Sequence, residues 1–143
     1  MIHILTETPR AAGVRVALQG GNLGTVRGDV AASYRTDRLG VVVMGEHFDT
    51  DGFVAVREDL IAPIDRPAGS RHSMGFAKAE YTAGERLGLH ASVSYLDEDR
   101  IVGTSLRHTG LALGMVKAGA RLDAGRGNDI ALKVFVGDQT FSS

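Results

Sequence analysis

Two groups of acidic residues have the side-chain type and spacing that could bind a calcium ion. Asp49 and Asp51 precede Gly52, and residues 97–99 form an Asp-Glu-Asp run further along the chain. Carboxylate oxygens are ligands that calcium takes in proteins. Asp-Gly is also ordinary turn chemistry, so the same residues could simply solvate loops. The five histidines show no metal-ligand spacing. We therefore predict neither a metal site nor a cofactor.

Arginines supply further candidate ligand-binding groups. They are Arg57, Arg66, Arg71 and Arg100. A guanidinium group pairs well with a carboxylate or a phosphate, so these side chains could bind an anionic solute. The alternative is that each arginine solvates a loop or pairs with a neighbouring acidic residue. Together with Asp49 and Asp51, these arginines are the predicted substrate-binding residues.

No catalytic constellation accompanies these residues. The chain has no cysteine, no GxSxG motif and no HExxH motif. The glycine-rich segment 20–25 superficially resembles a phosphate-binding loop, but the following segment alternates as a strand and supplies no helix N-terminus. We predict that the protein is not an enzyme.

The composition limits the class of protein. A chain of 143 residues is enough for one structural unit with a core. The 16 basic and 17 acidic residues nearly cancel, so nothing indicates a nucleic-acid surface. Nineteen glycines and a hydrophobic content of 43% make the chain too apolar for disorder and too rich in glycine for a helical bundle. No segment reaches the roughly 20 apolar residues of a membrane-spanning helix.

The elements that would position the candidate residues are β-strands, because the dominant hydrophobic period is two. Leu87 to Tyr95 is the clearest example, with apolar side chains at every second position. About seven segments are predicted strands; residues 41–44 are apolar on both faces and are included because valine favours sheet. The segments are 14–19, 26–35, 41–44, 72–81, 87–95, 110–122 and 130–137. Segment 110–122 could also be helical, but each glycine in it would cost a helix about 1 kcal/mol. The sequence predicts an all-β antiparallel fold.

Short and long connections alternate between these strands. The short ones are 35–38, 82–86 and 123–129, and the long ones are 49–70 and 96–107, although the first connection, 20–25, is also short. Outer-membrane barrels have short periplasmic turns and long extracellular loops. Aromatic residues near the predicted strand ends fit the interfacial girdles of such barrels, although a soluble sandwich would also place some there. The pattern favours a barrel wall with residues 49–70 and 96–107 outside.

Short segments spaced along the chain carry a family resemblance. They are Ile2-His3-Ile4-Leu5-Thr6 followed by Pro9, then Gly20-Gly21-Asn22-Leu23-Gly24-Thr25, Phe48-Asp49-Thr50-Asp51-Gly52-Phe53, Asp99-Arg100 with Gly103-Thr104, and Asp138-Gln139-Thr140-Phe141. In this order they resemble the end of the plug and the early barrel strands of a TonB-dependent outer-membrane receptor.

The resemblance implies two domains and a fold. Residues 1–9 would be the last strand of the plug domain, and residues 10–143 the N-terminal part of the β-barrel domain. Receptors of this type close with about 22 strands, so we expect a fragment, a partial antiparallel transmembrane β-barrel. Charged residues of alternating segments would face plug or water inside it. They are Arg15, Arg27, Asp29, Arg35, Lys78, Glu80, Lys117, Arg121 and Lys133.

The resemblance also implies a function. The parent receptor would take up a scarce solute across the outer membrane, such as a siderophore or another metal chelate, or a vitamin. Its partners would be outer-membrane lipid, that small-molecule ligand, and the TonB system acting through the missing plug region. The alternative is a soluble antiparallel β-sandwich that acts as a binding module and stays monomeric in water. A small barrel formed by oligomerisation is a third hypothesis.

Overall fold

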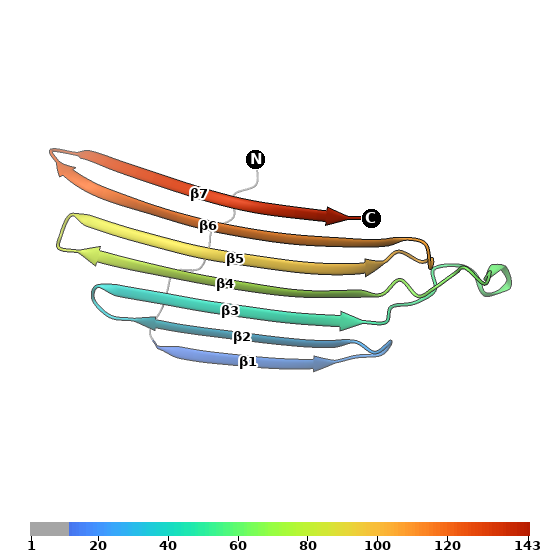
Figure 1. The fold of residues 1–143 in the computed structure, drawn as a ribbon. Helices are drawn as coiled ribbons and strands as arrows, with labels where there is room; N and C mark the ends of the chain where they lie inside the picture. The colour runs from blue at the N-terminus through green and yellow to red at the C-terminus, as the bar shows by residue number, and fades with distance from the viewer. Residues whose placement is uncertain (1–11) are drawn as a thin grey trace.

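Residues 12–143 of the computed structural model form one antiparallel β-sheet (Figure 1). The strands lie side by side in chain order, and each pairs with the next one along the chain. They are β1 (Gly13–Gly20), β2 (Val26–Arg35), β3 (Leu39–Thr50), β4 (Ser70–Ala83), β5 (Leu87–Ile101), β6 (His108–Gly125) and β7 (Asn128–Ser142). A short 3-10 turn, η1 (Glu58–Leu60), lies between β3 and β4. The predicted all-β antiparallel fold is confirmed.

Each predicted strand segment lies inside an observed strand. Residues 110–122, which could have been a helix, belong to β6, and residues 41–44 belong to β3. Valine favours sheet, and the pairing of β6 with both neighbours satisfies its backbone despite the glycines. The predicted plug strand, residues 1–9, lies outside the described residues. Within the described part of the chain, no helix has the length and apolar character needed to cross a membrane.

The predicted connection 96–107 is wrong in its extent. Strand β5 continues to Ile101 and β6 begins at His108, so only residues 102–107 connect them. Residues 97–99 are acidic on both faces of the strand, which is why the sequence pattern indicates a loop. Their backbone groups nevertheless pair with β4 and β6, and the side chains of Glu98 and Asp99 contact Arg100 and His108. Tertiary pairing therefore overrides the local preference of an acidic run.

The sheet closes on neither side, because β1 and β7 each pair with only one strand among the described residues. Three tight turns join β2 to β3, β4 to β5 and β6 to β7 at one end. The three other connections lie at the opposite end, where residues 51–69 extend well beyond the strands (Figure 1). The short-turn end and the loop end of the prediction are thus confirmed as opposite ends of one sheet.

Strand register assigns each side chain to one of two faces, since directly paired residues lie on the same face. One cross-strand row contains Lys78, Ser92 and Lys117. All the charged residues predicted to share a face do share it, and we call it the charged face. The opposite side, which carries Val16, Val43 and Val93, is the apolar face.

The charged face also has an apolar belt that the sequence pattern did not indicate. It consists of Val42, Met44, Met74, Phe76, Leu96, Leu113 and Met115. Val42, at 6% exposure, is the one buried apolar side chain in the described residues. The belt residues and the charged residues lie along the same face of the same strands. Segments such as 72–81 therefore have apolar residues on both faces, and their period of two is less clear.

Candidate functional site

The two ends of the long β3–β4 connection are held together. The Ala68 N–H donates to the Phe53 carbonyl oxygen at 2.9 Å. Gly52 has φ +68°, and a Cβ there would overlap the carbonyl oxygen of Ala68 and lie 2.9 Å from the Gly69 nitrogen. Only glycine fits this close approach without strain. The base of the loop is therefore a fixed structure, and its tip extends from that base.

The same loop is bonded to the β5–β6 connection. Arg66 donates its N–H to the Gly103 carbonyl oxygen at 3.1 Å, and Ser105 donates to the Ile64 carbonyl oxygen at 3.0 Å. Asp65 and Thr104 form an isolated antiparallel bridge between these hydrogen bonds. Two connections far apart in the sequence are thus joined into one surface at the loop end of the sheet.

Strand β3 is also attached to the β1–β2 connection. The Thr50 hydroxyl donates to the Leu23 carbonyl oxygen at 3.2 Å and lies 2.8 Å from the Thr25 hydroxyl. The backbone of Asp51 donates to the same Leu23 oxygen at 3.0 Å. The segments 20–25 and 48–53, which carry part of the family resemblance, are therefore in direct contact.

Replacement of the Thr50 hydroxyl by a methyl group tests this attachment. We expect Thr50→Val to lower the free energy of unfolding by about 1–2 kcal/mol, because partly buried hydrogen bonds are lost without a change of shape. Thr109→Val on β6 is the matched control, since the Thr109 hydroxyl makes no hydrogen bond in residues 12–143; we expect a change below about 0.5 kcal/mol. Urea unfolding followed by far-UV circular dichroism measures both, and equal effects would contradict the attachment.

These attachments create a pocket of about 600 Å³ between the long loop and strands β4 to β6. Its lining residues are Thr50, Asp51, Arg66, Pro67, Gly69, Ser70, Arg71, Asp99, Ile101 and His108. Both acidic and basic side chains face the space, together with hydroxyl groups. Such a lining can hold a polar solute through hydrogen bonds and complementary charges.

Side-chain contacts fix several of the polar groups around the pocket. Arg71 Nε donates to Asp49 Oδ2 at 2.8 Å, and His108 Nε2 pairs with Asp99 Oδ1. The Arg66 guanidinium donates through one nitrogen to the carbonyl oxygens of its own loop at 2.8 and 2.9 Å. Because these pairs orient Arg71 and His108 in advance, the pocket presents defined donors and acceptors.

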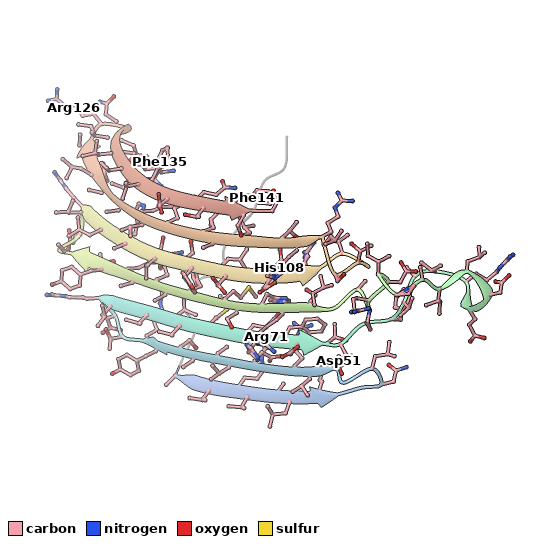
Figure 2. All side chains as sticks on the ribbon, turned by 45° about the vertical axis from the view of Figure 1, so that its right-hand side comes forward. Asp51, Arg71, His108, Arg126, Phe135 and Phe141 are labelled. Carbon is pink, nitrogen blue, oxygen red and sulfur yellow. The ribbon has the colours of Figure 1, made fainter. Side chains whose placement is uncertain are left out.

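The predicted substrate-binding residues are only partly brought together. Asp51, Arg66 and Arg71 line the pocket, and Asp49 is attached to it through Arg71. Figure 2 labels Asp51, which directly follows β3, and Arg71, which lies at the loop end of β4. Arg57 lies apart in the loop, where it pairs with Asp59 at 2.5 Å.

Some of these residues lie on strands rather than loops. Asp49 and Arg71 are paired positions of β3 and β4, and Arg100 belongs to β5. Arg100 lies on the charged face, away from the pocket, and its Nε donates to Glu98 at 2.8 Å. The loop placement predicted for these three residues is therefore wrong, because the strands extend beyond the alternating segments.

Sequence reasoning missed His108 as a pocket residue. His108 pairs with Ile101 across the β5–β6 hairpin, which places it beside Asp99. A hairpin with its turn at residues 102–107 would have predicted that these side chains lie together. The acidic run at residues 97–99 lacks the alternation of a strand, so the sequence pattern did not indicate this hairpin. Within residues 12–143, no three His, Asp or Glu side chains gather in a way that could hold a metal ion. The calcium hypothesis thus has no support in the described residues.

The charged face carries an ionic network across β2, β3 and β4. Glu46 accepts from Arg27 at 2.5 Å through one carboxylate oxygen and lies 3.1 Å from His72 Nε2 through the other. The His72 ring also stacks on Phe48, with ring centroids 5.1 Å apart. One half-buried carboxylate therefore joins three strands and pairs with the polar groups of Arg27 and His72.

The apolar face is a continuous band across the sheet. One cross-strand row is apolar on every strand and consists of Val14, Ala32, Val43, Ala77, Val93, Val116 and Val136. Nothing in the described chain covers this row, since Val14, Val93 and Val136 are 75%, 47% and 68% exposed. Exposed apolar surface that is continuous over a whole sheet marks an interaction surface.

The band runs obliquely to the strands. On β2 it extends from Val26 to Tyr34, and on β7 it extends from Ile130 to Val136. The cross-strand row that contains Val26 is polar on β3, β4 and β5, where it continues through Asp49, Arg71 and Asp99. The row that contains Ile130 is instead apolar on β4, β5 and β6, through Ala83, Leu87 and Leu122. The apolar band thus moves toward the short-turn end from β2 to β7.

Comparison with known proteins finds no family model, no curated protein and no solved structure that matches this chain.

Proposed function

We propose that this chain forms part of the wall of an outer-membrane β-barrel of the TonB-dependent receptor type. The parent barrel takes up a scarce solute, such as a metal chelate or a vitamin, across the outer membrane. The apolar face contacts lipid, and the charged face looks into the barrel. Further strands pair with the open edges of β1 and β7 and complete the closed sheet that a membrane requires.

The oblique apolar band is the observation that carries this proposal. Strands of a membrane barrel are inclined by about 35–45°, so a level belt of lipid crosses neighbouring strands at shifted positions. The stretch from Leu87 to Tyr95 extends roughly 27 Å along β5. At an inclination of 35–45° this stretch spans about 19–22 Å of the barrel's height, close to the apolar belt of outer-membrane barrels, which is about 25 Å tall. Tyr34 and Tyr81 flank the band at the short-turn end, and Tyr95 flanks it at the other.

The loop-end pocket supplies the solute-binding part of the proposal. Loops on a rigid scaffold commonly carry binding function, and these loops are bonded to one another around Asp51, Arg66 and Arg71. In the proposed orientation the pocket lies beyond the lipid belt, on the extracellular side of the membrane. The contact between segments 20–25 and 48–53 supports the receptor type, because it gives these two resembling segments a common structural role.

The rival function is a soluble β-sandwich that acts as a binding module. The apolar belt on the charged face, which includes Met44, Met74 and Met115, favours it, because a second layer could pack there. In that arrangement the apolar face would still need a cover, and a sandwich buries only one face of each sheet. The rival therefore leaves the larger apolar surface exposed to water.

The barrel wall and the soluble sandwich differ in whether the chain needs detergent to stay folded and monomeric. We expect the full chain to give a β-sheet circular dichroism spectrum in octyl glucoside and to aggregate when detergent is diluted below its micelle concentration. Size-exclusion chromatography at the same protein concentration measures the aggregation. A folded monomer in detergent-free buffer would overturn the barrel proposal in favour of the sandwich. The receptor type is tested by the coding region upstream of Met1, which should encode a plug-like segment, in frame or disrupted.

A further inference from the structure

Another hollow, of about 850 Å³, opens on the charged face near the short-turn end and spans β4 to β7. It lies at the opposite end of the sheet from the loop-end pocket. Its apolar lining includes Phe76, Met115 and Phe135, and its polar lining includes Lys78, Glu80, His90, Ser92, Ser94, Lys117, Arg121 and Lys133. Figure 2 labels Phe135 on β7, at the outermost strand of the hollow. The hollow combines aromatic surface with an excess of cations.

Only some of these cations have an acidic partner. Lys78 Nζ lies 2.6 Å from Glu80 Oε1, and Arg121 lies 2.5 Å from Asp129 Oδ2. Lys117 and Lys133 form no ion pair with any residue in 12–143. Glu80 is the one carboxylate among the lining residues, and Lys78 already occupies it. The hollow thus has a positive charge that its own walls do not neutralise.

The two lysines without partners are neighbours. Lys117 pairs in register with Phe135, and Lys133 pairs with Gly119, which lies on the same face as Lys117. The two side chains are therefore diagonal neighbours on adjacent strands, within reach of one bound group. Like charges in this arrangement repel each other, and an anion between them removes that repulsion.

A histidine and a serine face the same space. A Cβ at Gly119 would overlap the His90 ring, so that ring lies across Gly119 between the positions of Glu80 and Lys133. Neither ring nitrogen of His90 has a hydrogen-bond partner in the described residues, and the Ser92 hydroxyl also has none. The hollow therefore presents two ammonium groups, an imidazole and a hydroxyl above an aromatic surface.

We propose that this hollow binds an oxyanion attached to an apolar group, as in an aryl or alkyl phosphate or carboxylate. Lys117 and Lys133 pair with the oxyanion, His90 and Ser92 donate hydrogen bonds to it, and the apolar group packs on Phe135 and Met115. The site does not depend on the membrane or on the loop-end pocket, since all its residues lie on β4 to β7.

Methionine methyl groups provide a direct test on the full chain, folded in octyl glucoside or, if it proves soluble, in buffer. With ¹³C-methyl methionine, titration with phenyl phosphate and, separately, with benzoate should shift the Met115 signal. Met44 and Met74, on the same face outside the hollow, should not move. Phenol tests the need for the oxyanion and should cause no saturable shift. A response to either anion supports the site and identifies its preferred group.

Paired variants show whether the lysines bind the anion. We expect the double variant Lys117→Gln, Lys133→Gln to weaken binding at least tenfold, and we expect added salt to weaken binding to the original chain. Arg15→Gln is the control, because Arg15 lies on the charged face of β1 and outside the hollow; its affinity should stay within twofold. The proposal is overturned if neither anion shifts Met115, if phenol binds equally well, or if the double variant retains full affinity.

Discussion

Ala32→Arg is expected to lower the free energy of unfolding in a detergent micelle or bilayer by about 1–3 kcal/mol, whereas Ala31→Arg is expected to change it by less than about 1 kcal/mol. The two alanines are adjacent on β2 and point to opposite faces. Ala32 belongs to the row that is apolar on every strand. An arginine there would place its charge inside the lipid belt, between its middle at Val30 and its short-turn edge at Tyr34.

Ala31 is a close control because the substitution, the strand and the side-chain size are the same. It lies on the charged face, in register with Arg15 and Met44, and Asp29 is on the same face of β2. An arginine at this position points toward water and can pair with that carboxylate. Urea unfolding in octyl glucoside, followed by circular dichroism, compares both variants with the original chain. If Ala31→Arg is the more damaging change, the charged face is the buried one and the sandwich is the better hypothesis.

Gly52→Ala is expected to open the base of the long loop, at a cost of about 2–5 kcal/mol to the local structure. A residue with a side chain at φ +68° pays about 1–2 kcal/mol. The added Cβ also overlaps the carbonyl oxygen of Ala68, and forced overpacking costs a further 1–3 kcal/mol or so. Because the obstacle is backbone, no rotation of a side chain can relieve it.

Gly103→Ala separates the cost of the backbone conformation from the cost of the overlap with Ala68. Gly103 has φ +72°, but a Cβ there meets nothing within 4 Å, so this variant pays for the backbone conformation alone. Trypsin cleavage after Arg57 reports the opening of the loop; Arg66 precedes Pro67 and is not a trypsin site. We expect cleavage in Gly52→Ala to be roughly five- to a hundredfold faster than in Gly103→Ala, from about 1.4 kcal/mol for each factor of ten. Equal rates would show that the loop base is not held as the structure has it.

Much of the architecture is encoded in local pattern. Alternation over Leu87 to Tyr95 and the other apolar segments determined where strands form, and it determined that Lys78, Lys117 and Lys133 share one face. A period of two allows this because successive side chains point to opposite sides of the sheet, so the face of a residue follows from its position alone. Short polar turns likewise determined which connections lie at the same end.

The ends of the strands and the composition of the two pockets were decided by tertiary structure. Residues 97–99 are acidic and lack alternation, yet β4 and β6 on either side satisfy their backbone groups and hold them in β5. The loop-end pocket depends on hydrogen bonds between connections far apart in the sequence, such as Arg66 to Gly103. The diagonal placement of Lys117 and Lys133 on adjacent strands depends on the β6–β7 register. Alternation gives the face of each residue, but only strand pairing determines which residues on that face become neighbours.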